Sequence, residues 1–261
     1  LYKVTSGTIN VAIGRQTMYN NTEGSHNMAL GTYSLYTNTT GSFNVGIGTS
    51  SLFANTTANY NTAIGHDTLK ANTTGTFNVA IGALSLDANT TASSNTAVGY
   101  ASLGANITGA QNTALGYEAG LASTNEGNTF IGYHAGKTTT GYQNTLIGGR
   151  AGENVTSIRA VSLGYLSMQE NVGSTQGDVA VGYLAMQYKD TTDGGSIAIG
   201  QMALRGVSND KATGQDNVAV GRYAMQNYTS AANNIAIGKN TLNATTTAAN
   251  NVAIGHEALK A

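Results

Sequence analysis

The sequence predicts an all-β fold, a repetitive parallel β-solenoid or β-roll of about fifteen short coils. Three observations lead to this prediction. An aliphatic residue followed by glycine recurs along the chain at a nearly constant spacing. A short run of β-branched and small residues precedes each of these glycines, and a turn rich in asparagine, threonine and glycine follows it. The chain contains 34 glycines and no proline, so no position lacks a backbone N–H for hydrogen bonding.

The repeat is defined by its glycine, which we call the repeat glycine. The spacing between successive repeat glycines is 17 six times, 16 three times, 18 twice, 21 once and finally 17 twice. Internal periods of this kind indicate a solenoid, in which equivalent residues stack about 4.8 Å apart. The fifteen repeat glycines are Gly14, Gly31, Gly48, Gly65, Gly82, Gly99, Gly116, Gly132, Gly148, Gly164, Gly182, Gly200, Gly221, Gly238 and Gly255.

We expect residues 1–261 to form a single repeat array. Its repeats are regular over residues 10–148 and 223–261, and irregular and rich in charge over residues 149–222, which hold 7 of the 13 acidic residues. The pattern stops at Ala261 in the middle of a repeat, so we expect the chain to be an excerpt of a longer fibre protein.

Two apolar columns are expected to form the core. The residue before the repeat glycine is always Ile, Leu or Val, as in Ile13 and Leu30, and we expect it to face inward. Four residues after the repeat glycine comes Leu or Met in twelve repeats. Gly120, Gly136 and Gly152 occupy this position in three successive repeats, where the core must narrow or be filled in another way.

Two further columns have expected backbone roles. The repeat glycines, Gly14, Gly31, Gly48, Gly65, Gly82 and Gly99 among them, predict a positive φ or a close approach of two backbones. Asparagine stands four residues before the repeat glycine in twelve repeats, which suggests a stacked amide ladder. The ladder includes Asn10, Asn27, Asn44, Asn61, Asn78 and Asn95, and it is interrupted at Ala160, Asp178 and Ser196.

One chain supplies few large apolar side chains for a closed core. A three-sided prism of hexapeptide repeats would need aliphatic residues at Lys70 and Thr76, so a single-chain prism is disfavoured. Several parallel copies could instead pool their apolar edges around a common axis, which favours a homotrimeric rod.

The motif Asn-[Thr/Val]-Ala-[Ile/Val]-Gly, as at Asn61 to Gly65, resembles the head repeat of YadA-like trimeric autotransporter adhesins. This resemblance implies a left-handed parallel β-roll made by three chains. The longer form, with Asn-Thr-Thr-Gly between copies as at Asn38 to Gly41, resembles repeats of bacteriophage tail-fibre proteins. The present repeats, with spacings from 16 to 21, are longer than those of the adhesin head.

Composition excludes several functions. Only 10% of residues are charged, with 12 basic against 13 acidic side chains, so we expect no nucleic-acid partner. No apolar run approaches the roughly 20 residues of a membrane span, so we expect no membrane insertion by this segment. The absence of cysteine excludes disulfides and thiol chemistry. The four histidines show no ligand spacing, so we expect no metal and no cofactor, although a threefold axis could bring together three copies of His26.

Two surface features are candidates for binding. The first is a loop expected from Leu204 to Gln215, with Arg205, Asp210 and Lys211 available to a partner. The second is the position just after the repeat glycine, where tyrosine could present its ring to sugars, although we favour a structural ladder there. Its tyrosines are Tyr100, Tyr117, Tyr133, Tyr165 and Tyr183.

We therefore expect a non-enzymatic structural and attachment segment of an extracellular trimeric fibre. A phage tail fibre on the virion, contacting a glycan or protein receptor of the host, is preferred, and the head of a bacterial surface adhesin is the alternative. Two further alternatives are a glycan-cleaving enzyme, using Asp190 with Asp193 or Asp210 with Asp216, and an ice-binding array. The array would use the threonine column Thr39, Thr56, Thr73 and Thr90.

Overall fold

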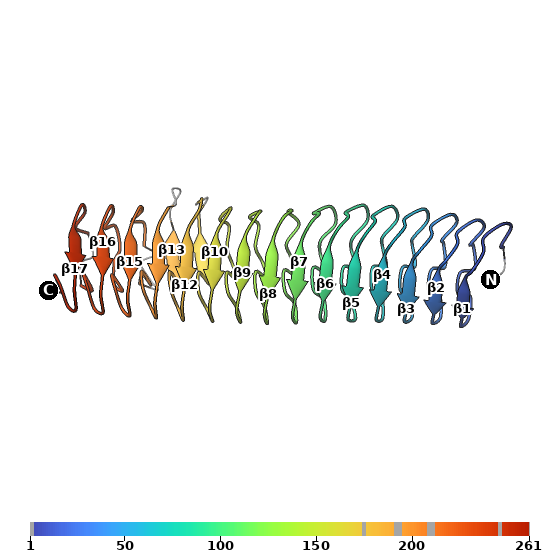
Figure 1. Ribbon diagram of the computed structural model, residues 1–261, viewed down its shortest axis with the longest axis horizontal. Coiled ribbons are helices and arrows are strands. Elements are labelled where there is room, and N and C mark those ends of the chain that lie inside the picture. The colour runs from blue at the N-terminus through green and yellow to red at the C-terminus, as the bar shows by residue number, and fades with distance from the viewer. Residues whose placement is uncertain (1–2, 174–175, 191–194, 208–211, 245–246, 261) are drawn as a thin grey trace. The chain divides into compact units, whose positions relative to one another are not determined.

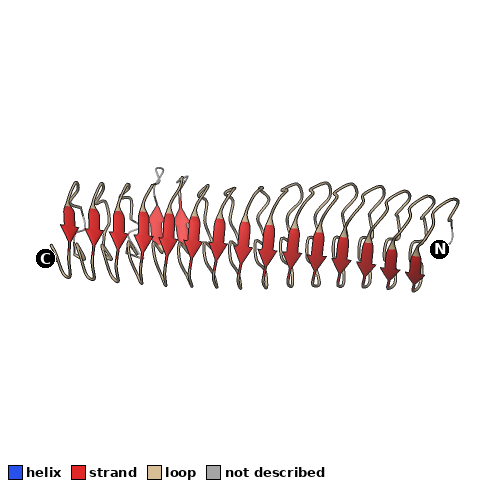
Figure 2. Cartoon of the chain, in the orientation of Figure 1, coloured by secondary structure: helices blue, strands red, loops and turns tan. Residues whose placement is uncertain are grey.

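The protein is an all-β parallel β-solenoid of about 14 turns, and no helix occurs in the part of the chain that the structure describes. The computed structural model describes residues 3–173, 176–190, 195–207, 212–244 and 247–260. The expected all-β solenoid is confirmed. Each coil places one short strand on the same side of the coil, and turns, with a second short strand in two of the coils, complete the circuit (Figure 2). Contacts divide the chain into two compact units, Leu1–Gly127 and Asn128–Ala261, which are described separately.

The first unit contains seven three-residue strands that lie side by side and run in the same direction (Figure 1). Each strand pairs in parallel with the strand one repeat further on, so that Ala63 lies opposite Ala80 and Ile64 opposite Ile81. The strands are β1 (Val11–Ile13), β2 (Met28–Leu30), β3 (Val45–Ile47), β4 (Thr62–Ile64), β5 (Val79–Ile81), β6 (Thr96–Val98) and β7 (Thr113–Leu115).

The second unit contains a main parallel sheet in the order β8-β9-β10-β12-β14-β15-β16-β17 and a small parallel pair, β11 with β13. The main strands are β8 (Thr129–Ile131), β9 (Thr145–Ile147), β10 (Val161–Leu163), β12 (Val179–Val181), β14 (Ile197–Ile199), β15 (Val218–Val220), β16 (Ile235–Ile237) and β17 (Val252–Ile254). The small pair is β11 (Glu170–Val172) with β13 (Tyr188–Asp190), and it belongs to the two coils with a spacing of 18.

The interior of each coil is lined by the middle residue of its strand, which is most often alanine. Ala29, Ala63, Ala97 and Ala114 are completely buried. The residue before the repeat glycine points outward instead, with Ile13 59% and Ile254 68% exposed, so the expectation that this column faces a core within the chain was wrong. Side chains alternate along a strand, and the thin coil interior accepts the small side chain while the larger aliphatic ones face out.

The Leu or Met column lies in the interior, as expected. Leu35, Leu52 and Leu69 are fully buried, although Leu259 near the end of the array is exposed. In the coils of Gly136 and Gly152 the strand supplies the missing volume, because Phe130 and Leu146 replace alanine at the middle position. A side chain added at Gly152 would meet the Cδ1 atom of Leu146 at 2.6 Å, which shows that this volume is already filled.

The repeat glycines bring successive backbones into direct contact. Gly65 has φ +139°, and a Cβ atom there would lie 2.7 Å from the carbonyl carbon of Gly82. Both features exclude other residues, because this φ belongs to glycine and the space is occupied by the next coil.

Two amide ladders run along the first unit. In the ladder from Asn10 to Asn112, the side-chain oxygen of each asparagine accepts a hydrogen bond from the backbone N–H of the next, as between Asn44 and Asn61 at 3.0 Å. A second ladder, which was not predicted, lies in the Asn-Thr-Thr-Gly turns, where Asn55 Nδ2 donates to Asn38 Oδ1 at 2.8 Å. Its hydrogen-bonded members are Asn21, Asn38, Asn55, Asn72 and Asn89, all fully buried; Asn106 stands in the same column but bonds to Gly109 instead of Asn89.

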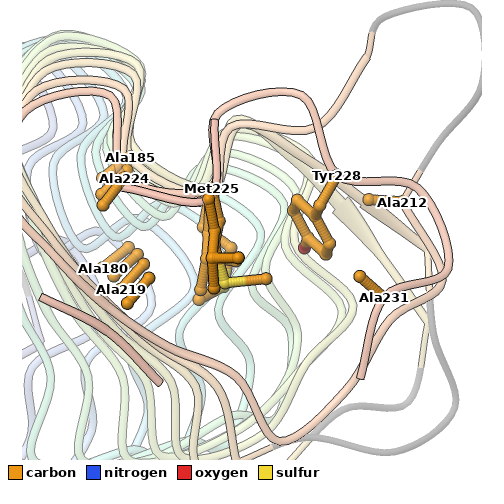
Figure 3. Close-up of a cluster of buried hydrophobic side chains, with 14 of the residues drawn as sticks. Ala180, Ala185, Ala212, Ala219, Ala224, Met225, Tyr228 and Ala231 are labelled. Carbon is orange, nitrogen blue, oxygen red and sulfur yellow. The ribbon is translucent and has the colours of Figure 1, made fainter. Parts of the chain in front are cut away.

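The interior of the second unit follows the same plan with different side chains. Figure 3 shows the strand alanines Ala180 and Ala219 facing the Met225 column, and the ring of Tyr228 between Met225 and the alanines Ala212 and Ala231. Tyr228 stands seven residues after its repeat glycine, the position that holds the second asparagine ladder in the first unit. A large ring therefore replaces an amide without disturbing the sheet register.

Candidate functional site

The outer face of the sheets carries aliphatic side chains within each unit. Residues one and three positions before the repeat glycine point outward, since the middle residue points in. Contiguous apolar surface on a soluble protein marks an interaction site. The exposed members are Val11, Ile13, Met28, Leu30 and Ile81 in the first unit, and Ile199, Ile235, Ile237, Val252 and Ile254 in the second.

The predicted tyrosine column lies on the surface and is partly stacked. Tyr100 and Tyr117 stack with ring centroids 5.2 Å apart, and Tyr165 and Tyr183 stack at 6.1 Å. Tyr133 stacks on His134 at 3.8 Å. All five side chains are 44 to 54% exposed. The column therefore combines contacts between neighbouring coils with accessible ring edges and hydroxyl groups.

A longer aromatic stack in the first unit was not predicted. His26, Phe43, Tyr60 and Phe77 stack in succession, with centroid distances of 4.7, 5.0 and 5.1 Å. Each has a left-handed φ near 60°, and Phe43, Tyr60 and Phe77 are 47 to 58% exposed. The residue before each ladder asparagine forms this stack, so the recurrence of an aromatic residue once per repeat was the signal that could have revealed it.

The position five residues after the repeat glycine differs between the units. In the first unit it carries the half-buried stack of Tyr19, Tyr36 and Phe53, with centroids 5.5 and 5.3 Å apart. In the second unit it carries a hydrogen-bonded polar row: Gln169 donates to Glu153 at 3.0 Å, Gln187 to Gln169 at 3.0 Å, and Arg205 to Gln187 at 3.2 Å.

One residue of the expected binding loop, Arg205, belongs to this polar row. Arg205 is half-buried at the end of the row, and its guanidinium lies 5.7 Å from the centre of the Tyr188 ring. Arg205 is therefore tied to the preceding coil rather than presented on a free loop. Asp210 and Lys211 lie outside the described residues, as do Ser208 and Asn209.

Charge concentrates around Glu153. Its carboxylate accepts a hydrogen bond from Arg150 Nε at 2.8 Å and lies 3.5 Å from His134 Nδ1. Partial burial opposes ionisation, but the hydrogen bonds from Arg150 and Gln169 outweigh it and lower the pKa of Glu153. The bond to Glu153 also raises the pKa of Arg150. This pairing stabilises the turn and leaves Glu153 without the raised pKa of a general acid.

A shallow hollow of about 370 Å³ lies in the first unit, lined mainly by Leu84, Ala88, Ala101 and Leu121, with Asp87 at its wall. Burial raises the pKa of Asp87. No second carboxylate lines the hollow, so it does not provide the pair that glycoside hydrolysis uses.

The proposed catalytic pairs and the ice-binding array gain no support. Asp193 and Asp210, one member of each carboxylate pair, lie outside the described residues. The hydroxyl groups of Thr39, Thr56 and Thr73 donate to carbonyl oxygens of the next coil at 3.0 to 3.2 Å, which removes them from a free surface array. Among the described residues, no three His, Asp or Glu side chains gather as a metal site.

Comparison with known proteins adds no assignment: no protein-family model, no curated protein and no solved structure matches the chain. Across the described ranges, no helix has the length and apolarity needed to cross a bilayer. The surfaces described above are therefore the basis for a functional proposal.

Proposed function

We propose that this chain is a structural and surface-attachment segment of an extracellular homotrimeric fibre, most simply a bacteriophage tail fibre that contacts its host. In this proposal three parallel copies form a left-handed β-roll and cover one another's outer sheet faces. The observation that carries the proposal is the aliphatic outer face, which repeats on strands of both units and has members that the described residues leave exposed.

A further copy of the same chain suits this face for two reasons. Copies in parallel have the same strand spacing, so the aliphatic side chains of one copy can interlock with those of its neighbour along the array. Three copies related by a closed rotation leave no apolar face open, whereas an open arrangement would continue to add chains. Burial of this surface adds apolar contact between the copies to the narrow interior of each coil.

The trimer is tested by solution mass. We expect the purified chain to have a mass of about 80 kDa, three times its 26.6 kDa. Replacing both Leu30 and Ile81 by lysine places charge in the proposed interface and should reduce the mass to that of one chain. The matched control, lysine at the exposed turn residues Thr40 and Thr74, should leave the trimer intact. A monomeric wild-type chain would refute the trimer.

Attachment is proposed to involve the exposed tyrosines and the aromatic stack from His26 to Phe77. Aromatic side chains bind sugars through ring faces and edges and bind proteins through large apolar contacts. The test is binding of the labelled trimer to bacterial cells and their isolated surface polysaccharides, before and after replacement of Tyr100 and Tyr117 by alanine. We expect binding by the wild type and at least a several-fold loss in the variant.

The second candidate is the head of a bacterial trimeric surface adhesin, which the Asn-Thr-Ala-Ile-Gly motif also favours. Binding to animal cells or matrix proteins, without binding to bacterial polysaccharide, would select this candidate. The proposed role is non-enzymatic in both cases. Release of reducing sugar ends from a bound polysaccharide would overturn that part of the proposal, and thermal hysteresis would select the ice-binding alternative.

A further inference from the structure

The second unit contains a buried cluster of an amide, an acid and an amine: Asn171, Asp178 and Lys189. All three side chains are fully buried. Lys189 Nζ donates to Asp178 Oδ1 at 2.7 Å, and Asn171 Nδ2 donates to Asp178 Oδ2 at 3.2 Å. A single carboxylate group therefore holds an amine and a carboxamide at the same time.

The backbone places the amine and the amide in adjacent positions. Asn171 lies directly opposite Lys189 in the parallel pairing of β11 with β13, and both side chains point into the coil. Residues paired in this way lie on the same face at one strand spacing. Asp178 is fixed independently, because its Oδ1 atom also accepts the backbone N–H of Ser196 at 3.0 Å. The three groups therefore come from three separately held segments.

The surroundings of the cluster are apolar. Asn171 Nδ2 lies 3.9 Å from the sulfur of Met186, and Val155, Met168 and Leu204 belong to the same buried core. The hydroxyl group of Tyr228 is buried without a hydrogen-bond partner, and burial raises the pKa of that group. An ion pair in such an interior is seldom more stable than neutral groups of the same size. The regular coils have asparagine at the positions of Asp178 and Lys189, so stacking alone does not require the charged pair.

We propose that Lys189 and Asn171 react with each other to form an intramolecular isopeptide bond, with Asp178 as the proton-transfer group. In this proposal one proton moves along the bond from Lys189 to Asp178, which gives the neutral amine that attacks and the neutral acid that later protonates the leaving nitrogen. A lysine amine freed of its proton in an apolar pocket is a nucleophile. The carbonyl oxygen of Asn171 accepts a hydrogen bond from Ser157 Oγ at 3.4 Å, which draws charge from the carbon to be attacked.

The reaction balances without an oxidant or a further reactant. The lysine nitrogen forms a bond to Cγ of Asn171, and the bond from Cγ to Nδ2 breaks. Asp178 gives its proton to the departing nitrogen and accepts one from the attacking nitrogen, so that one ammonia molecule leaves and a secondary amide remains. The product joins β11 to β13 covalently and closes a loop between neighbouring coils. This inference concerns a single chain and does not depend on the proposed fibre function.

The test is the intact mass of the folded, purified chain under denaturing conditions. We expect a mass about 17 Da below that of the sequence, the loss of one ammonia. Cleavage on the N-terminal side of aspartate separates Asn171 from Lys189, and the two peptides should remain joined. Lys189→Arg keeps the positive charge and should show the full sequence mass. Asp178→Asn restores the amide of the regular ladder and should also show the full mass.

Variants that fail to fold would not confuse the result, because the double variant Asp178→Asn with Lys189→Asn reproduces the residues of the regular coils. It should fold, as judged by circular dichroism, and should carry the full mass. A folded wild type with the full mass, whose Lys189 amine is acetylated after unfolding, would overturn the proposal. A loss of about 18 Da would indicate a direct bond from Lys189 to Asp178 instead and would exclude Asn171 as the acceptor. A loss of about 17 Da that persists in Lys189→Arg would indicate a cyclised Asn171 and would also overturn it.

Discussion

The regular coils of the first unit and the irregular coils over residues 149–222 have the same parallel strand arrangement but different interiors. In the first unit both buried polar columns are asparagine, and hydrogen bonds join the asparagines of successive coils, in the second column from Asn21 to Asn89. In the irregular coils the second column holds Val155, Asn171 and Lys189, and the first column holds Ala160, Asp178 and Ser196. A ladder of identical amides can continue indefinitely, whereas each irregular residue needs a particular partner. The coils can therefore stack without continuous asparagine ladders, and the side chains inside a coil can vary.

The spacing of repeats also differs between the two regions, whereas the register of the strands does not. The spacing from β10 to β12 and from β12 to β14 is 18, and that from β14 to β15 is 21, compared with 17 in the first unit. The middle strand residues Ser162, Ala180, Ala198 and Ala219 still pair in register. The extra residues therefore fall in the turns. Close contact between repeat glycines and the small middle residue of each strand are kept in both regions, and these features set the pitch.

The largest expected effect comes from the repeat glycine. Gly65→Ala forces a side chain into an unfavourable φ of +139° and places Cβ 2.7 Å from the backbone of Gly82. We expect a loss of about 5 kcal/mol or failure to fold, measured by urea denaturation. Gly177→Ala is the matched control in the irregular region, because its φ is +76° and no atom lies within 4 Å of the added Cβ. It should cost about 1 kcal/mol. Equal effects would show that the contact between coils is unimportant.

The second prediction concerns variants that replace the packing of Phe130 on Gly136 by the alanine and leucine packing of the regular coils. Phe130→Ala removes the ring that lies over Gly136 and should cost about 3 to 4 kcal/mol through the cavity left behind. Adding Gly136→Leu recreates the alanine and leucine pair of the regular coils, and Gly136 already has the φ of +58° that leucine adopts in this column. The double variant should recover most of the loss in thermal denaturation. If the double variant is no more stable than Phe130→Ala, the two packing schemes are not interchangeable.

The third prediction contrasts two carboxylates with opposite pKa shifts. The lowered pKa of Glu153 means that it adds stability above its ordinary value of 4.5, and this stability is lost as pH falls through the folded-state pKa. The wild type should therefore lose about 1 kcal/mol more than Glu153→Gln between pH 7 and pH 3. Asp87 has a raised pKa, so its contribution to stability is present below pH 3.8 and is lost as pH rises. Asp87→Asn should stabilise the protein slightly at pH 7, and destabilisation there would contradict the assignment.

The smallest expected difference is between two variants in the exposed aromatic stack. Tyr60→Ala removes ring contacts to Phe43 and Phe77 and should cost about 1 to 2 kcal/mol. Tyr60→Asn removes the same contacts but relieves the left-handed φ of 59°, and asparagine already occupies this position at Asn233 and Asn250. The asparagine variant should therefore be more stable than the alanine variant by about 0.5 kcal/mol in urea denaturation. An equal loss of stability in both variants would show that the lost stacking, and not the left-handed φ, determines the effect.

The candidate binding surfaces were only partly predictable. The exposed tyrosine column could be located because the columns follow directly from the repeat. Arg205 was expected on a projecting loop, but its hydrogen bond to Gln187 arises from a row five residues after each repeat glycine. That row contains residues of unrelated types, and only stacking brings Glu153, Gln169 and Gln187 together.

The sequence by itself determined the repeat, the positions of the strands, the glycine conformation and the first amide ladder, because each depends on a local requirement that recurs in every coil. Only the tertiary structure decided which face of the strand is buried. Alternation allows either Ala63 or Ile64 to point inward, and the narrow interior of the coil selects the alanine. The structure also decided that Asn171, Asp178 and Lys189 meet, because their separations along the chain have meaning only once irregular coils are stacked in register.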